Sequence, residues 1–112
     1  MRRQKIRISK KRDFDNVFKN GKSIRGAFLI LRFVKNNLEN SRFAFLVSKK
    51  VSARAVVRNK IRRRLQESVK NFMGGLKENI DAVFIVNPSI KDKNFFETKE
   101  EVEKILNKIP QR

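Results

Sequence analysis

Apolar residues in the first part of the chain recur at the spacing of an amphipathic helix. Phe14, Val17 and Phe18 stand at i, i+3 and i+4, so they share one face of a helix. Ser9 is suited to cap the start of this helix and Gly21 to follow its end. The pattern predicts a short helix that presents two aromatic rings on one side.

Two runs typical of β-strands come next. Residues 28–34 are apolar on both faces apart from Arg32, and residues 42–47 have a similar composition after an Asn-rich turn. We expect the two runs to pair as an antiparallel hairpin. Residues 23–25 are a candidate for one further short strand.

The longest predicted element covers residues 52–73. This segment contains no Gly or Pro and is followed by two Gly residues, which predicts a helix of about 22 residues, roughly 33 Å long. Its apolar positions fall within one arc and form the predicted core stripe, which consists of Val57, Ile61, Leu65, Val69 and Phe72.

The last third of the chain predicts a strand and a helix. Residues 80–86 are almost entirely apolar and end at Asn87, which favours a strand buried on both faces, in a parallel or mixed sheet. Thr98 and Glu101 have the spacing of a capping box. Apolar positions then repeat at i, i+3, i+4 and i+7, at Val102, Ile105, Leu106 and Ile109. With the short strand included, the predicted order is α-β-β-β-α-β-α.

Net charge indicates the kind of partner. The chain carries 29 Lys and Arg against 11 Asp and Glu, a net charge of +18. Residues 1–64 hold 21 of the basic and 3 of the acidic residues, so the whole excess lies there. Such self-repulsion lowers stability unless a polyanion neutralises it, and nucleic acid phosphate is the commonest such polyanion.

Composition excludes several kinds of site. The chain has no Cys and no His, so it has no disulfide, no Cys or His zinc site, no thiol nucleophile and no imidazole acid or base. No window approaches 18 consecutive apolar residues, and the Arg-rich start lacks the apolar segment of a secretory signal. We expect a cytoplasmic protein without membrane contact.

Cations are concentrated in the first half of the long predicted helix. Residues 54–64 include six basic residues and no acid, whereas a solvent-facing helix normally mixes Glu with Lys. Arg54, Arg58 and Arg62 step at i+4 and therefore line up along the helix. Arg binds phosphate through a planar, bidentate fork, so this row is suited to a nucleic acid backbone.

Three further polar residues lie within or beside this row. Asn59 lies inside it and is either a reader of a base edge or 2′-hydroxyl, or a plain solvated amide. Lys49 and Lys50 precede the helix and extend the positive surface to the edge of the sheet.

Phe14 and Phe18 have two interpretations. Aromatic residues at i and i+4 of a helix usually pack in a core. A chain with ten Phe and no Trp or Tyr can, however, stack unpaired bases only on Phe or Arg. A helix face over an open sheet face forms a groove that fits single-stranded nucleic acid. Both roles can coexist in one residue.

Several segments resemble the bacterial ribonuclease P protein family. The resemblance is carried by residues 48–51 and 55–63 with Leu65 and Glu67, and by residues 13–21, which look like the family's N-terminal motif. Residues 81–88 are similar to the family's strand before the last helix. In that family a ribozyme RNA removes the 5′ leader of precursor tRNA with magnesium, and the small basic protein binds both the catalytic RNA and the leader.

The resemblance implies a fold and a domain organisation. The implied fold is an α/β (α+β) two-layer sandwich with a mixed four-stranded sheet, three helices and a left-handed βαβ crossover through the basic helix. General rules favour the opposite hand. Residues 1–112 are then a single RNA-binding domain, since this length supports one core, and residues 1–8 are a flexible basic tail.

The resemblance also implies roles for individual residues. Binding to the catalytic RNA falls to Lys49, Lys50, Arg54, Arg58, Asn59, Lys60, Arg62 and Arg63. A cleft for the single-stranded leader is lined by Phe14, Phe18, Phe28, Ile30 and Arg32. No residue of the protein is catalytic, Mg²⁺ is used by the RNA and none is expected on the protein, and the protein is expected to be monomeric without RNA.

Three positions depart from the family pattern. Family strands often present a Tyr where this chain has Arg32, and an Arg commonly stands where this chain has Asn87. Lys60 replaces an Arg of the basic motif, which keeps the charge and loses the bidentate geometry.

Two other functions compete with this one. A structural ribosomal-RNA-binding protein would use the same basic surface, but would not need a single-stranded cleft. A stand-alone nuclease would hold metal with Asp13, Asp15, Asp81 or Asp92, although these show no clustered metal-ligand motif. Restored processing by a purified ribozyme RNA, or cleavage by RNA-free protein, separates the three functions.

Overall fold

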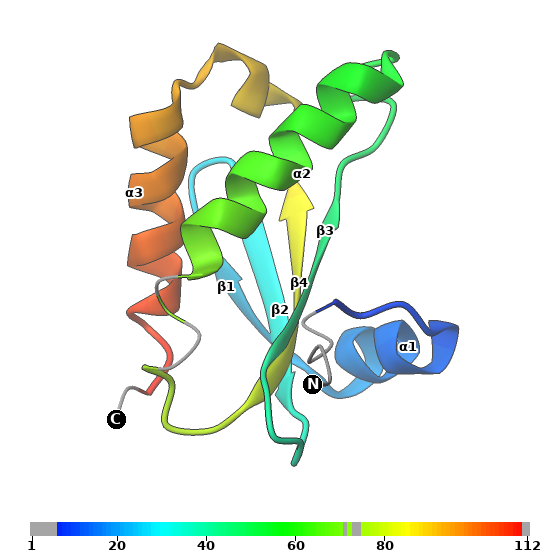
Figure 1. Cartoon of the computed structure of the whole chain (residues 1–112), viewed down its shortest axis with the longest axis vertical. Coiled ribbons are helices and arrows are strands. Elements are labelled where there is room, and N and C mark those ends of the chain that lie inside the picture. Colours follow the sequence, from blue (N-terminus) through cyan, green and yellow to red (C-terminus); the bar gives the residue numbers. More distant parts are fainter. Residues whose placement is uncertain (1–6, 71, 73–74, 111–112) are drawn as a thin grey trace, which may run out of the picture.

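The computed structural model describes residues 7–70, 72 and 75–110. Figure 1 shows its elements, which in chain order are α1 (Lys11–Asn20), β1 (Lys22–Arg25), β2 (Leu29–Lys35), β3 (Arg42–Leu46), α2 (Ala55–Lys70), β4 (Ile80–Val86), the 3-10 helix η1 (Pro88–Asp92) and α3 (Phe95–Leu106). The predicted order of helices and strands is confirmed, with η1 added between β4 and α3.

The four strands form one mixed sheet in the order β1-β2-β4-β3. β1 and β2 are antiparallel, β2 and β4 are antiparallel, and β3 and β4 are parallel. The predicted antiparallel hairpin of residues 28–34 with 42–47 is therefore wrong, because β4 lies between β2 and β3. β4 is buried at six of its seven positions, and a strand this apolar is most stable in the centre of a sheet.

α2 makes the parallel connection from β3 to β4. In Figure 1, β3 is the strand nearest the viewer, and the chain crosses through α2, on the side of the sheet that carries α3, before it returns to β4 further back. The crossover is left-handed, as the family resemblance implied and against the general preference.

The larger hydrophobic core lies between the sheet and the pair α2 and α3. Phe84 of β4 is fully buried there, and its ring stacks with those of Phe43 and Phe45 at centroid distances of 6.4 and 5.7 Å. The predicted stripe of α2 is confirmed: three residues are buried and two are partly buried, in the order Ile61, Leu65, Val69, Val57 and Phe72. The predicted apolar residues of the last helical segment are all buried, namely Val102, Ile105, Leu106 and Ile109.

α1 lies on the opposite face of the sheet. Val17 of α1 is fully buried in a second cluster with Ile8 and Val83, and Phe14 packs against this cluster. Val83 adjoins Phe84 in β4, so the two side chains point to opposite faces. The sandwich of sheet and helices thus gains a partial third layer.

Only part of the predicted basic tail is described. Residues 1–6 lie outside the described residues. Arg7 forms a parallel bridge with Phe43 of β3, and Ile8 is 5% exposed. Residues 7 and 8 are therefore part of the fold and not of a free tail, because Ile8 fills the space between β3 and α1.

Two helix ends differ from those predicted. Lys10, not Ser9, is the N-cap of α1, and no side chain caps this end. α2 has 16 residues rather than about 22, because the chain before Ala55 forms a turn at residues 49–51. The predicted stop at Gly74 lies outside the described residues.

The capping box of α3 also lies elsewhere than predicted. Asn94 and Glu97 form it, and the Asn94 side chain accepts the backbone N–H of Glu97 at 2.8 Å. Thr98 and Glu101 are already inside the helix, one turn further along. Asn94 with Glu97 and Thr98 with Glu101 have the same spacing. The choice between these two candidate capping boxes depends on where the preceding 3-10 helix ends.

Glu101 instead anchors the β1–β2 turn to α3. Its carboxylate accepts the backbone N–H groups of Ala27 and Phe28 at 2.9 and 2.7 Å. Gly26 makes this approach possible, because a Cβ at this position would lie 2.9 Å from the Glu101 carboxylate. The turn at this end of the sheet is thereby held against the helix layer.

Candidate nucleic-acid interface

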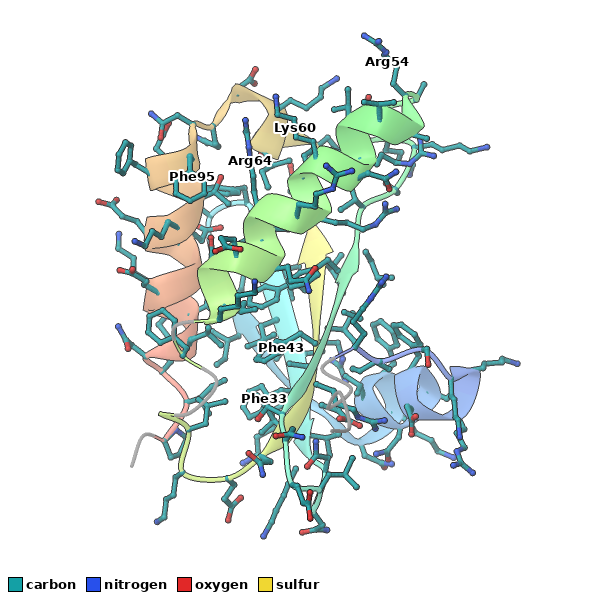
Figure 2. All side chains as sticks on the ribbon, in the orientation of Figure 1. Phe33, Phe43, Arg54, Lys60, Arg64 and Phe95 are labelled. Carbon is teal, nitrogen blue, oxygen red and sulfur yellow. The ribbon has the colours of Figure 1, made fainter. Side chains whose placement is uncertain are left out.

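The basic residues predicted for RNA binding lie on α2 and on the turn before it. We call this group the α2 surface, and its members are Lys49, Lys50, Arg54, Arg58, Asn59, Lys60, Arg62 and Arg63. Six of the eight side chains are exposed, and Arg58 and Arg62 are partly exposed. Arg54 and Lys60 point away from the sheet, as Figure 2 shows. The predicted residues are thus accessible to a ligand, and their role in RNA binding stays a prediction.

No carboxylate pairs with the α2 surface in the part of the chain that the structure describes. The ion pair of α2 itself joins Lys70 to Glu67 at 3.3 Å, beyond the end of the surface. The first turn of α2 contains no acid, although acidic residues there would stabilise the helix through its dipole. The arrangement thus works against the stability of α2 and suits an external anion.

Two guanidinium groups of this surface are oriented by neutral partners. Arg58 donates to the carbonyl oxygens of Ser52 and Ala53 at 2.9 and 3.0 Å. Arg62 donates to the amide oxygen of Asn59. These bonds fix the directions of two cations without cancelling their charge, and they leave the Asn59 amide N–H groups for a ligand.

Four of the five residues predicted for the leader cleft lie on the other face of the sheet. Ile30 and Arg32 point to that face because they alternate with core residues of β2. The two rings both belong to α1. Phe14 is partly buried, and Phe18, one turn further along, is 38% exposed. We call Phe14, Phe18, Ile30 and Arg32 the aromatic face. Phe14 thus packs in a core cluster, whereas Phe18 remains accessible and its role in base stacking stays a prediction.

Arg32 is engaged by the end of α1. Its Nη2 donates to the carbonyl oxygens of Phe18 and Gly21 at 2.6 and 3.1 Å, and its Nη1 donates to Ser23 Oγ at 2.7 Å. The side chain thus satisfies carbonyl groups that a helix C-terminus leaves without partners. A glycine is needed at position 21 because its N–H donates to the Val17 carbonyl oxygen at 2.9 Å, and a Cβ there would lie 2.2 Å from that oxygen.

Phe28 does not offer its ring to the aromatic face. Its side chain is 5% exposed and belongs to the core on the α2 and α3 side. Lys93 Nζ lies 5.6 Å from the ring centroid. Phe28 thus lies apart from the other four predicted cleft residues, although it lines the hollow described next. Residues 28–34 are apolar on both faces, and this pattern does not reveal which face a residue just before the strand will join.

A hollow of about 470 Å³ lies between the two surfaces. Its lining includes Ile30 of the aromatic face, Lys50 of the α2 surface, and Ile85, Asn87 and Arg25. Side chains assigned to two different RNAs therefore border one space. Ile85 was not among the predicted residues, because β4 is apolar on both faces and its sequence does not show which side is left uncovered.

Arg42 links α1 to the sheet through two acids. Its Nε donates to Asp81 Oδ1 at 2.8 Å, and its Nη1 lies 3.4 Å from Asp13 Oδ2. The hydrogen bond to Asp81 raises the pKa of Arg42. Asp81 is 3% exposed and also accepts from Asn36 Nδ2 at 3.0 Å. Asp13 and Asp81, considered as metal ligands for a nuclease, are thus partners of a structural arginine.

Acidic side chains do not converge elsewhere in the described part of the chain. No group of three or more that could hold a metal ion is found there. None of the described helices is both long and apolar enough to cross a membrane.

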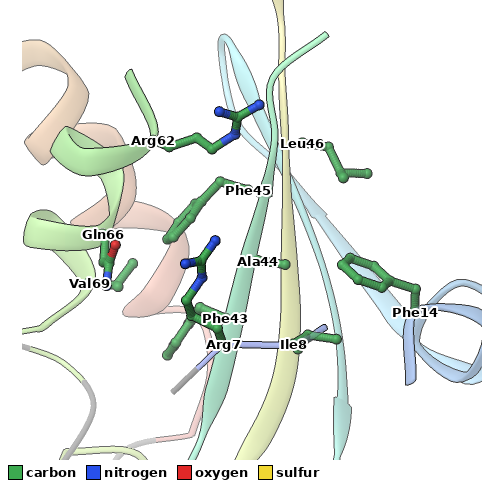
Figure 3. A pocket seen from close by; sticks show the side chains of 10 residues that line it. All are labelled: Arg7, Ile8, Phe14, Phe43, Ala44, Phe45, Leu46, Arg62, Gln66 and Val69. Atoms are coloured by element: carbon green, nitrogen blue, oxygen red, sulfur yellow. The ribbon is translucent and has the colours of Figure 1, made fainter. Parts of the chain in front are cut away.

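A second hollow lies at the edge of β3 and was not predicted. It has a volume of about 140 Å³. As Figure 3 shows, its lining comes from the N-terminal segment, from α1, from β3 and from α2, and comprises Arg7, Ile8, Phe14, Phe43, Ala44, Phe45, Leu46, Arg62, Gln66 and Val69. Only Arg62 and Phe14 among them carried a predicted role, since the position of Arg7 beside α2 depends on pairing across the fold.

Sequence comparison relates the chain to one family. The family described as Ribonuclease P matches residues 1–110. The ribonuclease P protein component of Caldanaerobacter subterraneus subsp. tengcongensis is 34% identical over 110 residues, which are 98% of this chain and 94% of that protein. That of Syntrophomonas wolfei subsp. wolfei is 39% identical over 92 residues, 82% of this chain and 76% of that protein.

Comparison with solved structures gives the same result as the sequence comparison. The RNase P protein of Staphylococcus aureus superposes with a TM-score of 0.84 at 28% identity, over 93% of this chain and 94% of that one. The RNase P protein from Thermotoga maritima gives 0.81 at 28% identity, over 92% of this chain and 96% of that one. The fold and the sequence point to the same family.

Proposed function

The chain belongs to the ribonuclease P protein family, and from this premise we propose that its α2 surface docks on the ribonuclease P RNA while its aromatic face receives the 5′ leader of precursor tRNA. As the protein component of ribonuclease P, it is part of a ribonuclease holoenzyme, acts in the processing of tRNA 5′ ends and has the ribonuclease P RNA as its partner. The family decides against the ribosomal alternative. The assignment of individual residues is the proposal.

The observation that carries the proposal is the unpaired charge of the α2 surface. Seven of its eight residues are cationic, and no carboxylate pairs with them among the described residues. Phosphate groups of a folded RNA would neutralise this row, and each neutralised phosphate releases a counterion. Arg58 and Arg62 are held in fixed directions, which lowers the entropy lost when they bind.

We place the cleavage chemistry in the RNA. The described carboxylates are dispersed, and Asp81 is engaged by Arg42 and Asn36, so the protein's residues do not fit a magnesium ion. In this proposal Mg²⁺ is held by the RNA, and the protein supplies no step of phosphodiester cleavage. The cations of α2 reduce the repulsion between RNA phosphates, so the holoenzyme should need less magnesium than the RNA alone.

The aromatic face would distinguish precursor from mature tRNA. An exposed ring such as Phe18 stacks an unpaired base without selecting its identity, and only the precursor carries an unpaired 5′ leader. The hollow that contains Ile30 and Lys50 lies at the border between this face and the α2 surface. Arg32 would act here mainly by positioning α1, because three of its hydrogen bonds are already made.

Two further properties complete the proposal. The protein would be monomeric without RNA, because a net charge of +18 opposes self-association; sedimentation at moderate salt measures this directly. It would work in the cytoplasm, where precursor tRNA is available to the holoenzyme.

The deciding experiment reconstitutes the holoenzyme from this chain and a purified ribonuclease P RNA. At a magnesium concentration too low for the RNA alone, adding the chain should restore removal of the 5′ leader. The same preparation should bind precursor tRNA more tightly than mature tRNA.

Controls separate the proposal from its alternatives. RNA-free protein should leave precursor tRNA intact, and cleavage by it would revive the stand-alone nuclease. Equal affinity for precursor and mature tRNA would remove the leader from the proposal and leave only the binding of the catalytic RNA.

A further inference from the structure

The outer edge of β3 has free hydrogen-bonding groups. β3 pairs with β4 on one side only, and on the other side Ile8 N–H donates to the Phe43 carbonyl oxygen at 3.2 Å. Backbone groups alternate in direction along a strand, so the N–H and C=O of Phe45, two residues after Phe43, also point outward. Neither group has a hydrogen-bond partner among the described residues.

Phe45, whose backbone groups point outward, is one of the residues that line the hollow of about 140 Å³. One water needs only about 10–15 Å³ of such volume, so the hollow has room for a group of several heavy atoms. Phe45 and Leu46 belong to its lining, and Leu46 is 40% exposed. A ligand there would meet an apolar wall and a backbone donor and acceptor together.

The charge of the hollow is entirely positive. Arg7 and Arg62 line it from segments 55 positions apart in the chain, and no carboxylate does. In Figure 3 both guanidinium groups lie beside the β3 strand. Arg7 forms no ion pair with a described residue, and the partner of Arg62 is the neutral Asn59. The Gln66 side chain, one helical turn after Arg62, adds a neutral amide that can donate and accept.

We infer that the β3 edge hollow binds one unpaired nucleotide of the precursor leader, at the point where the leader passes from the aromatic face toward α2. The inference rests on the proposed function and adds a substrate contact at the β3 edge, where Arg62 of the α2 surface binds the leader in place of the catalytic RNA. Phe14 lines the hollow and also belongs to the aromatic face, so one strand can follow both. A phosphate would bind the two guanidinium groups. The Phe45 C=O would accept from a 2′-hydroxyl or a base amino group, and the Phe45 N–H would donate to a base carbonyl oxygen or ring nitrogen.

A protein ligand would make fewer favourable contacts at the edge of β3 than a nucleotide. An added β-strand would pair with the backbone of Phe45, but it would leave Arg7 and Arg62 facing neutral peptide groups. An unpaired nucleotide supplies the anion, the hydrogen-bond donor and the planar ring at once. We therefore take the leader as the occupant, and an acidic peptide is an outcome of the test.

The test uses the reconstituted holoenzyme and precursor tRNAs whose leaders are shortened one nucleotide at a time. Gln66→Glu places a negative charge in the hollow, and Arg7→Ala removes a positive one; neither residue belongs to the α2 surface. Asn107→Asp and Lys104→Ala are matched controls with the same charge changes at exposed positions of the α3 end. We expect each hollow variant to weaken binding of long-leader precursors by about tenfold. Leaders too short to reach β3, and mature tRNA, should bind unchanged.

A direct readout comes from the Phe45 amide in isotope-labelled protein. Its NMR proton resonance should move downfield when a leader oligonucleotide is added, and the Gln66→Glu substitution should abolish the shift. Thermal unfolding of each variant shows that the fold is kept, and the two variants are tested separately so that failure of one to fold leaves the other.

Four outcomes decide the inference. Loss that depends on leader length supports it. Equal loss for every leader length and for mature tRNA overturns it in favour of a general electrostatic effect. No loss in either variant, while Phe18→Ala still weakens precursor binding, overturns it and leaves the proposed function standing; no loss in any of the three overturns both. A Phe45 shift with an acidic peptide and none with the leader assigns the edge to a protein.

Discussion

Arginine serves opposite purposes on the two sides of the sheet. On the α1 side, Arg32 and Arg42 hold the helix at its two ends, one through carbonyl oxygens and the other through carboxylates. On the α2 side, Arg58 and Arg62 have only neutral partners, and Arg63 has no recorded partner among the described residues. The first pair builds the surface on which a ligand can rest, and the second group is left charged for the ligand itself. Net charge alone does not distinguish a structural arginine from one that is left for a ligand. The hydrogen-bond and ion-pair partners of each side chain make the distinction.

The largest effect on stability is expected for substitution of Arg42, the arginine that links α1 to the sheet. Arg42→Ala leaves the Asp81 carboxylate buried without its cation, which should lower the free energy of unfolding by about 3–5 kcal/mol. Urea denaturation measures the change. The pairing raises the pKa of Arg42, so its stabilisation is fully present below the ordinary arginine pKa and is lost only as pH rises through the higher value. The loss caused by Arg42→Ala should therefore be the same throughout the neutral range, and a small loss would contradict the comparison.

Arg32→Ala should have the next largest effect. It removes the donors that satisfy the Phe18 and Gly21 carbonyls, at a cost of about 1–3 kcal/mol. Hydrogen exchange should accelerate in α1 and stay unchanged in α3. Arg25→Ala, on the neighbouring strand and exposed, is the matched control; equal exchange in the two variants would show that α1 does not depend on Arg32.

Phe18 separates a backbone role from a side-chain role. Phe18→Ala keeps the carbonyl that accepts from Arg32 and removes only the exposed ring, so the fold should be retained. Precursor binding by the holoenzyme should weaken by about 1–3 kcal/mol, the value of one stacked base. Mature tRNA should bind as before, and equal losses on both substrates would refute a leader role.

The smallest effect on the protein itself is expected for Arg63→Ala. Unfolding free energy should change by less than about 0.5 kcal/mol, because no described residue pairs with this side chain. The slope of log affinity against log salt for the ribonuclease P RNA should fall by roughly one unit. An unchanged slope would remove Arg63 from the α2 surface, and a large loss of stability would make it a structural arginine like Arg42.

Local features could be predicted from the sequence, whereas partners across the fold could not. The core stripe of α2 and the strand at residues 80–86 follow from periodicity within one segment, and the charge of α2 is visible in eleven consecutive residues. The position of β4 between β2 and β3 depends on pairing over some fifty positions, which no local pattern encodes. The hand of the crossover came from the family resemblance and not from general rules.

The same distinction between local features and long-range partners applies to the candidate site. The α2 surface could be predicted because its members lie on one helix. Phe28 was misplaced because an apolar run does not reveal its inward face, and Arg32 was given to the leader because the α1 carbonyls that engage it come from another element. Arg7 and Gln66 were missed because only the folded β3 edge brings them to one hollow.

The order of the sheet also constrains how the protein can fold during synthesis. The central strand, β4, is the last of the four along the chain, so β1, β2 and β3 cannot become one sheet until residue 86 has emerged from the ribosome. By then every residue that carries the excess positive charge has been made. Closure of the sheet is thus a late, long-range step of the kind that slows folding, and ribosome profiling of protease-resistant nascent chains should find protection only after β4 has left the exit tunnel.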